Sequence, residues 1–306
     1  MTRARRVSVV IPVRNGGVTL PALLAGLGPG DVELIALDNA STDDSRTLLE
    51  SAGARVLSVP EGAFDHGETR NRGAREAEGE FVVFLSQDTR PVGPGFTDRL
   101  VAPLERDARL AGAFARQQPR DDADARTRRD LRGWVAGQHE ARVVFLESPE
   151  ALARLSPLER LRLAAFDNVA SVVRRSTLLE HPFPSSRFGE DLEWSQAVLA
   201  RGLGIAYVPE AVVVHSHART ARALYRRNYL GHRLFRRLFG LVTVPDRPHL
   251  VRASCGAVMS DLATLMREGA SASAWLAAPA QAVAATLGQY RGARDETNGR
   301  PYPEWA

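Results

Sequence analysis

The chain has 306 residues, of which 44% are hydrophobic and 25% are charged, and its formal net charge is only +4. This composition is typical of an ordinary soluble protein with one large domain or two modest ones. The single cysteine, Cys255, excludes an internal disulfide, and no stretch of about 18 apolar residues could span a membrane. The basic start runs directly into a strand-like segment, so we expect no signal peptide and a cytoplasmic location.

The basic side chains are unusual in kind, because all 40 are arginine and the sequence contains no lysine. A complete replacement of lysine by arginine indicates a genome-wide codon preference more than selection for an arginine-rich surface. We therefore give the arginine content little weight as a sign of nucleic-acid binding, and we expect no nucleic-acid partner.

Four short apolar runs in the first hundred residues predict β-strands. Their hydrophobicity is nearly continuous rather than alternating, as in strands of a parallel sheet that is covered on both faces. Helix-like segments separate them, and the segment that begins at Ser41 has Asp43 and Asp44 in its first turn, where acids are favoured. This alternation predicts βαβ units and a doubly wound α/β sheet flanked by helices. The predicted strands are 7–13, 32–38, 54–59 and 81–86.

Polar side chains gather where these predicted strands end. We interpret Asp38 and Asp88 as the carboxylates that close the second and fourth strands, and Arg70 and Asn71 follow the third. In open α/β sheets, ligands bind beyond the carboxyl ends of the strands, so these side chains are candidates for one site. Turn and capping roles explain many Asp and Asn residues, but a solvated turn has no need of a carboxylate at the last strand position.

Asp88 is a candidate metal ligand. Mg²⁺ and Mn²⁺ bind several oxygens, often from water and phosphates besides one or two carboxylates. A lone carboxylate is therefore best explained if a substrate diphosphate completes the shell, which also explains how Gln87 can stand where a second acid is expected. His215 and His217 are two apart on a predicted strand, so they share a face and could bind a metal or a phosphate. The alternative for Asp88 is an N-terminal cap of the next segment.

A pair of acids precedes Trp194. Glu190 and Asp191 open a predicted helix, where the helix dipole favours acids, so capping alone could explain them. One of two adjacent acids can nevertheless face a cleft and accept a proton from an incoming hydroxyl. We assign Trp194 to the core in preference to the wall of a sugar site.

Residues 204–217 are predicted to form two short strands broken at Pro209, and most of the chain after them is predicted to be helical. Residues 218–240 form a cationic helix with seven arginines between 219 and 237 and apolar side chains among them. Such a helix either packs its apolar side on the sheet or lies on an anionic membrane surface. We therefore expect a main α/β domain over 1–217 and a C-terminal helical region over 218–306 that packs on it or touches a membrane.

Several stretches follow one another in a characteristic order and spacing. They are VSVVIPVRNGG, LDNASTDDS, FDHGETRNRGAREAEGEFVVFLSQDTRP, ARQQP, FDNVASVVRRS, FGEDLEWSQAVLARG and VVVHSH. Over roughly residues 6–240 the chain thereby resembles family 2 of the glycosyltransferases, which are nucleotide-sugar enzymes with the GT-A fold. Within this family it is most similar to the bacterial rhamnosyltransferases.

The resemblance implies a role for each matching position. The nucleotide-sugar donor would be bound by Pro12, Arg14, Asp38, Arg70 and Gln87. The metal, Mg²⁺ or Mn²⁺, would be held by Asp88, which matches the acid of the DxD element that here reads SQDT, and by His215 or His217. Asp191 matches the catalytic base.

The implied reaction is an inverting, metal-assisted transfer of a sugar, with rhamnose from dTDP-rhamnose as the donor that the resemblance suggests. The acceptor would be a hydroxyl of a glycan or a lipid-linked glycan, in polysaccharide biosynthesis at the cell envelope, with peripheral contact to the inner face of the membrane. Two alternatives remain open. A sugar-1-phosphate nucleotidyltransferase would need a glycine-rich phosphate loop and an activating lysine, which PVRNGGVTL lacks. A non-catalytic nucleotide-sugar-binding protein would need no base.

Overall fold

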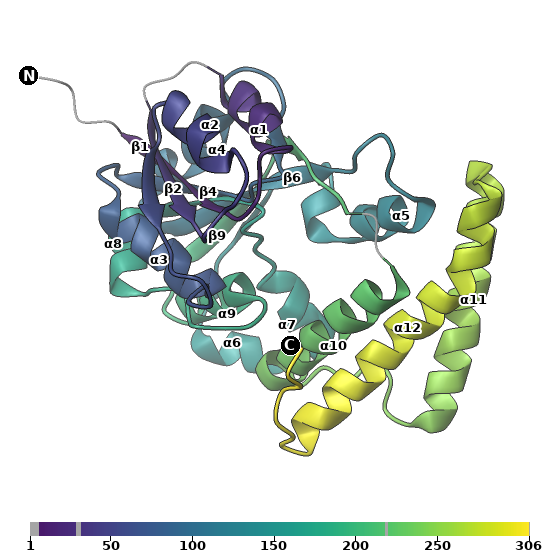
Figure 1. Cartoon of the computed structure of the whole chain (residues 1–306). Coiled ribbons are helices and arrows are strands. Elements are labelled where there is room, and N and C mark those ends of the chain that lie inside the picture. Colours follow the sequence, from purple (N-terminus) through teal and green to yellow (C-terminus); the bar gives the residue numbers. More distant parts are fainter. Residues whose placement is uncertain (1–5, 29–31, 218–219, 306) are drawn as a thin grey trace, which may run out of the picture.

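A computed structural model describes residues 6–28, 32–217 and 220–305 (Figure 1). The strands are β1 Val7–Val13, β2 Val32–Asp38, β3 Arg55–Ser58, β4 Phe81–Leu85, β5 Arg90–Pro91, β6 Leu110–Gln118, β7 Arg142–Val144, β8 Ala170–Arg174 and β9 Gly204–Val214. The helices are α1 Leu20–Leu27, α2 Ser45–Ser51, α3 His66–Glu76, α4 Phe96–Arg106, α5 Ala125–Gly133, α6 Pro149–Arg154, α7 Pro157–Leu163, α8 Arg175–Glu180, α9 Glu190–Leu199, α10 Ala221–Phe239, α11 Arg247–Glu268 and α12 Ala272–Thr297, with a 3-10 turn at Val135–Gly137.

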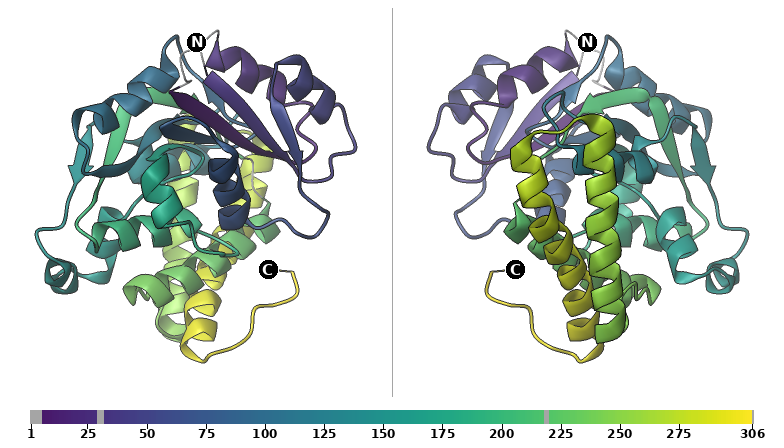
Figure 2. Two further views of the ribbon diagram at one scale, coloured as in Figure 1. Left: turned by 90° about the vertical axis from the view of Figure 1, so that its left-hand side faces the viewer. Right: turned by 90° about the vertical axis from the view of Figure 1, so that its right-hand side faces the viewer.

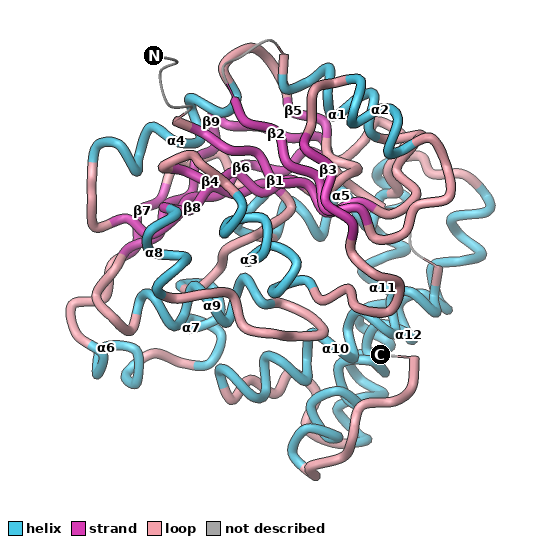
Figure 3. The backbone as a smooth tube through the Cα atoms, turned by 60° about the vertical axis from the view of Figure 1, so that its left-hand side comes forward, coloured by secondary structure: helices cyan, strands magenta, loops and turns pink. Residues whose placement is uncertain are grey.

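The strands form one mixed sheet in the order β3-β2-β1-β4-β8-β6-β9-β5, and β7 also pairs with β9. Strands β1 to β4 run parallel, and β8 is antiparallel to both of its neighbours. Figure 3 shows the strands as a band through the molecule, with α1, α2 and α4 on one face and α3, α8 and α9 on the other. The predicted α/β class, with a flanked sheet and a C-terminal helical extension, is confirmed.

Burial on both faces explains the continuous apolar runs. Val10 and Ile35 belong to the core under α3, α8 and α9, whereas Val9 and Val83 belong to the core under α1, α2 and α4. Because successive strand residues point to opposite faces, both sets must be apolar. The four predicted strands match β1 to β4, to within two residues at each end.

Three local expectations were wrong. Asp88 is not the last residue of its strand, because β4 ends at Leu85 and Asp88 lies in the turn before β5. Residues 204–214 form one strand rather than two broken at Pro209, because a shift in the β6–β9 register absorbs the proline. Helix α2 begins at Ser45 rather than at Ser41, since the intervening side chains bind a neighbouring loop, as described below.

The cationic helix α10 packs between the core of the sheet and another helix, and keeps some of its arginines exposed. Its Leu234 and Phe239 belong to the same core as the sheet. Helix α12 lies directly on its other side, because a Cβ at Gly288 or Gly292 would come within 2.5 Å and 2.2 Å of backbone oxygens of α10. An α10 arginine, Arg233, is buried and pairs with Glu296 of α12 at 2.9 Å.

The predicted domain boundary lies between 217 and 218. Residues 218 and 219 lie outside the described part of the chain, and the second of them, Arg219, belongs to the cationic run. The division into two domains stays a prediction, although α10 shares the sheet's core. Within the described ranges, no helix has both the length and the apolarity that crossing a bilayer requires.

Candidate active site

The loop after β1 is held by side chains from neighbouring strand exits. The amide of Arg14 donates to Gln87 Oε1 at 2.7 Å, and Gln87 Nε2 donates back to the carbonyl of Arg14 at 3.0 Å. The amides of Asn15 and Gly17 donate to Ser41 Oγ and Asp43 Oδ2, each at 2.9 Å. Together with a bond from Gly16 to Ser45, these contacts engage every backbone amide over 14–17. They also explain why residues 41–44 precede the helix rather than form its first turn.

The residues predicted to bind the donor lie along this edge. Asp38 is buried at the end of β2, beside Val13 in the parallel register, and accepts from the amide of Ser41 at 3.2 Å. Pro12 is half-buried in β1, and Arg14 is exposed with its guanidinium 3.1 Å from Glu61. Gln87 joins the first and fourth strand exits rather than facing the metal cluster. The donor-binding roles of these residues stay predictions.

The structure brings together Asp88, His215 and His217. Nε2 of His215 lies 3.5 Å and Nε2 of His217 3.2 Å from Asp88 Oδ2, and one ligand atom from each residue lies within 4.8 Å of the others. The cause is the antiparallel pairing of Arg90 with Val214, which sets the turn before β5 against the residues after β9. Both histidines therefore follow the strand rather than lie on it.

The chemistry of this cluster fits a divalent cation. Burial alone would raise the pKa of Asp88, but the hydrogen bond from His215 and the charges of both histidines lower it below its usual value. The carboxylate is therefore ionised at neutral pH, as a ligand must be. One carboxylate and two imidazoles leave open positions that water or phosphate oxygens could fill.

Gln117 connects this cluster to a second acid. Its Nε2 donates to Asp167 Oδ2 at 2.6 Å, which directs Oε1 toward Nδ1 of His215 at 3.1 Å. We therefore assign a proton to Nδ1 of His215, and Nε2, which faces Asp88, is the nitrogen that would bind a metal. A metal-binding histidine characteristically donates its other ring N–H in this way.

Replacing Gln117 by leucine is expected to weaken Mn²⁺ binding by roughly 10- to 100-fold, because His215 loses the acceptor that orients its ring. Titration of free Mn²⁺ by electron paramagnetic resonance measures this directly. Gln118→Leu is the matched control, since the side chain of the neighbouring Gln118 makes no hydrogen bond to the described residues. Equal affinities for both variants would contradict the assignment.

Asp191 lies at the start of α9, close to two other acids, Glu190 and Asp167. Its Oδ2 accepts from the amide of Asn168 at 3.1 Å, and Oδ1 accepts from Leu192 at 2.8 Å. Burial, followed by the charges of Glu190 and Asp167, raises the pKa of Asp191 to about 8. A carboxyl group with this pKa is poised to exchange a proton near neutral pH.

Arg70 is engaged by Glu190. Its Nη1 lies 2.8 Å from Glu190 Oε1, both side chains are 7% exposed, and the same nitrogen donates to the carbonyl of His66 at 3.1 Å. Contact with a donor diphosphate would require this pair to open, so the donor-binding role of Arg70 stays a prediction without support from the geometry. Trp194 is buried between Phe166 and Phe183, as expected of a core residue.

Glu190→Gln is expected to lower the free energy of unfolding by about 3–5 kcal/mol, because the Arg70 guanidinium would remain buried without its counter-charge. Urea unfolding followed by tryptophan fluorescence measures the loss. The control is Glu193→Gln, whose partner Arg237 is 43% exposed, so that this pair should contribute at most about 1 kcal/mol. Similar losses for both variants would show that the buried pair is not special.

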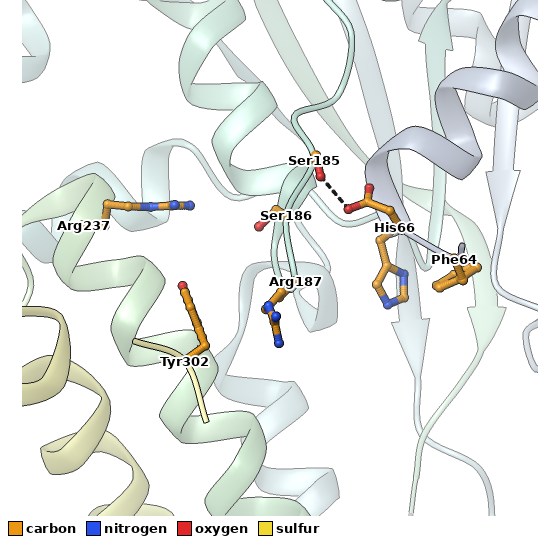
Figure 4. A pocket seen from close by; sticks show the side chains of 8 residues that line it. Phe64, His66, Ser185, Ser186, Arg187, Arg237 and Tyr302 are labelled. Carbon is orange, nitrogen blue, oxygen red and sulfur yellow. Dashed lines mark hydrogen bonds between the residues drawn. The ribbon is translucent and has the colours of Figure 1, made fainter. Parts of the chain in front are cut away.

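Of two cavities in the described part of the chain, the smaller is lined by a residue of this polar cluster, and the larger is connected to it only through His66, whose carbonyl accepts from Arg70. Figure 4 shows the larger, of about 610 Å³, between the loop before α3 and the loop before α9, where Ser185 donates to Asp65 at 2.8 Å. Its lining adds Phe64, His66, Ser186, Arg187, Arg237 and Tyr302. The smaller, of about 300 Å³, has Gln117 in its wall beside three arginines, Arg116, Arg128 and Arg132.

Three residues of the cluster were missed by the sequence interpretation: Gln117, Asp167 and Asn168. The first lies near the carboxyl end of β6, and ligand-binding side chains are expected at this end of a strand as they are after the first four strands. The other two precede β8. Because β8 is antiparallel to β4, its amino end lies at the same edge as the carboxyl ends of the parallel strands.

Part of the sequence is similar to known glycosyltransferases. Residues 8–156 match the family described as Glycosyl transferase family 2. The O-antigen chain rhamnosyltransferase WbaN of Salmonella anatum is 28% identical over 200 residues, which span 64% of this chain and 60% of that protein. The glucosyl-3-phosphoglycerate synthase of Mycobacterium tuberculosis H37Rv is 36% identical over 110 residues, 33% of this chain and 34% of that protein.

Solved structures share the fold. The mannosyltransferase PcManGT of Pyrobaculum calidifontis, in complex with GDP-Man and Mn²⁺, superposes with a TM-score of 0.60 at 15% identity, over 98% of this chain and 89% of that one. The Mycobacterium tuberculosis synthase with Mn²⁺, UDP-glucose and phosphoglyceric acid gives 0.54 at 24% identity, over 79% and 81%. These findings relate residues 8–156, a little under half of the chain, to glycosyl transferase family 2, and the chain shares the GT-A fold of the two solved glycosyltransferases.

Proposed function

We propose that the protein is an inverting glycosyltransferase that moves a sugar from a nucleoside diphosphate to a hydroxyl group. Asp88, His215 and His217 would hold Mg²⁺ or Mn²⁺, and Asp191 would act as general base. One observation carries the proposal: hydrogen bonds lead from His215 through Gln117 to Asp167, whose charge raises the pKa of Asp191. A cation site and a proton acceptor thus belong to one polar cluster.

The chemistry divides between the two ends of this cluster. A bound divalent cation would neutralise the charge that develops on the leaving diphosphate. Asp191 would take the proton of the acceptor hydroxyl as its oxygen attacks the anomeric carbon from the face opposite the diphosphate, which inverts the configuration. Asn168 holds Asp191 Oδ2 through its amide, which fixes the direction of the carboxylate.

The donor and acceptor are finer parts of the proposal. Similarity to an O-antigen chain rhamnosyltransferase favours rhamnose from dTDP-rhamnose as donor and a glycan or lipid-linked glycan as acceptor. The larger cavity could take acceptor sugars, because it combines the aromatic rings of Phe64 and Tyr302 with the hydroxyls of Ser185 and Ser186. We place the enzyme in the cytoplasm, with peripheral contact to the inner face of the membrane.

A sugar-1-phosphate nucleotidyltransferase fits this site less well. It would cradle phosphates with free backbone amides after β1, but the amides of 14–17 all donate to side chains of the protein. A non-catalytic nucleotide-sugar-binding protein would explain the cation site, but it would not explain why a carboxyl group with a raised pKa, that of Asp191, belongs to the same cluster.

Slow hydrolysis of the donor tests the proposal without a known acceptor. Nucleoside diphosphate release should appear with one sugar nucleotide from a panel that includes dTDP-rhamnose, should require Mn²⁺ or Mg²⁺, and should stop with a chelator. Thermal stabilisation by the same donor identifies it independently. Stabilisation without metal-dependent release from any donor would favour the binding protein, and a preference for another sugar would remove only the rhamnosyl assignment.

A further inference from the structure

Helices α11 and α12 carry their acidic side chains on the side that faces the protein and their exposed basic side chains on the outer side. Figure 2 shows them next to each other on the outside of the molecule, in front of the remaining chain in its right-hand view. All four acids of these helices face inward and pair with arginines elsewhere: Asp261 and Glu268 with α5, Glu296 with α10 and Asp295 with Arg300. The exposed charges of both helices are therefore all positive.

The outward arginines lack carboxylate partners. Arg247, Arg252 and Arg267 of α11 and Arg291 of α12 are exposed, and none forms an ion pair within the described residues. On α10, by comparison, Arg233 and Arg237 are paired, whereas the exposed Arg222 and Arg227 form no ion pair within the described residues. The hairpin thus adds an exposed cationic surface of its own beside that of α10.

Large apolar side chains stand among these arginines. On α11, Val251 is 65%, Met259 67% and Met266 74% exposed; on α12, Leu276 is 84% and Val283 44% exposed. At about 100° per residue, the three α11 side chains fall within a sector of about 80°, with Arg252 at its border. We call these five apolar residues and the four outward arginines the hairpin face.

We propose that the hairpin face binds the surface of an anionic lipid membrane. Its apolar side chains would enter the boundary between headgroups and acyl chains, while the arginines would meet lipid phosphates. Charge decides between this occupant and a second copy of the chain, because two hairpin faces brought together would set unpaired arginines against one another.

This inference extends the proposed function, which includes peripheral membrane contact, by naming the surface and the lipid charge that it needs. It rests on the exposed residues of α11 and α12 and uses none of the residues assigned to the metal or to the base. A membrane-bound acceptor would be brought to the enzyme by this contact, since binding at a surface raises the local concentration of both partners.

Co-sedimentation of the full chain with lipid vesicles tests the proposal. The protein should pellet in low salt with vesicles of phosphatidylcholine containing about one third phosphatidylglycerol, and not with phosphatidylcholine alone. The double variant Arg252→Glu, Met259→Glu should reduce partitioning by at least about tenfold. Its control, Arg106→Glu with Leu179→Glu, makes the same charge change at exposed positions of α4 and α8 and should bind as the native chain does.

Three outcomes would overturn the proposal: no binding to anionic vesicles, equal loss in both double variants, or a dimer in sedimentation equilibrium that only the hairpin variant dissociates. The last result would assign the face to a second copy. Metal-dependent donor hydrolysis, measured without vesicles, should be unchanged in both variants. Vesicle binding without hydrolysis would reject the proposed function alone, whereas hydrolysis without vesicle binding would reject this inference alone.

Discussion

Asp88→Asn is expected to abolish tight Mn²⁺ binding and to lower turnover by about a thousandfold. Asp88 supplies the sole carboxylate of the cluster found among the described residues, and the remaining ligands would be two neutral imidazoles. A cation at a leaving group stabilises the transition state by several kcal/mol, and each 1.36 kcal/mol corresponds to a factor of ten in rate. Electron paramagnetic resonance for Mn²⁺ and donor hydrolysis for turnover measure the two effects separately.

The control for this variant is Asp122→Asn, which removes an exposed acid from the loop after β6 and should change neither quantity. Circular dichroism should show that Asp88→Asn remains folded. Unchanged Mn²⁺ affinity in a folded Asp88→Asn protein would show that the cation binds elsewhere. Loss of affinity without loss of turnover would remove the metal from the mechanism and leave the site as a structural one.

The parallel half of the sheet could be predicted because each of its strands is marked by a short run of neighbouring apolar residues. Continuous apolar runs such as 7–13 and 81–86 can be buried on both faces only in a covered sheet, and the structure has them as β1 and β4. Asp88 and the HSH stretch were found because each follows such a run. Their meeting depended on the two-residue strand β5, which is too short to give a periodic signal.

The remaining parts of the site depend on long-range pairing. Asp167 lies at the same edge of the sheet as the other site residues because β8 runs antiparallel to its neighbours. The apolar sequence of 170–174 does not indicate in which direction that strand runs. Arg70 was predicted at the diphosphate because it follows the third strand, but the sequence could not show that Glu190, 120 residues later, lies 2.8 Å away. Contacts of this kind follow from tertiary packing rather than from local spacing.

The same limit applies to the cationic helix. Periodicity in 218–240 correctly predicted an amphipathic helix, now α10, but it could not say which element covers each side. Gly288 and Gly292 decide this, because their missing side chains let α12 approach the backbone of α10. Which surface of α10 remains free is therefore determined by two glycines that lie about 60 residues further along the chain, counted from Asn228 to Gly288.

Asp191→Asn is expected to lower turnover by about a hundred- to ten-thousandfold while leaving donor and Mn²⁺ binding unchanged. The amide keeps the shape of the side chain but cannot accept the proton of the attacking hydroxyl. Turnover with the identified acceptor, set beside thermal stabilisation by the donor, separates the two effects. An active Asp191→Asn protein would assign the proton to another group, and a matched loss in donor binding would make Asp191 a binding residue instead.

The pH dependence of turnover in the native enzyme is a second test of the role of Asp191 as general base. With a pKa of about 8, only about a tenth of Asp191 is ionised at pH 7, so turnover should rise with pH and level off above about pH 9. Asp167→Asn removes one of the charges that raise this pKa, and it should therefore move the rising limb to lower pH. Asp44→Asn, at the exposed start of α2, should leave the limb in place. A limb that stays fixed in Asp167→Asn would mean that a group other than Asp191 sets it, because the charge of Asp167 acts on the proton of Asp191 whether or not a substrate is bound.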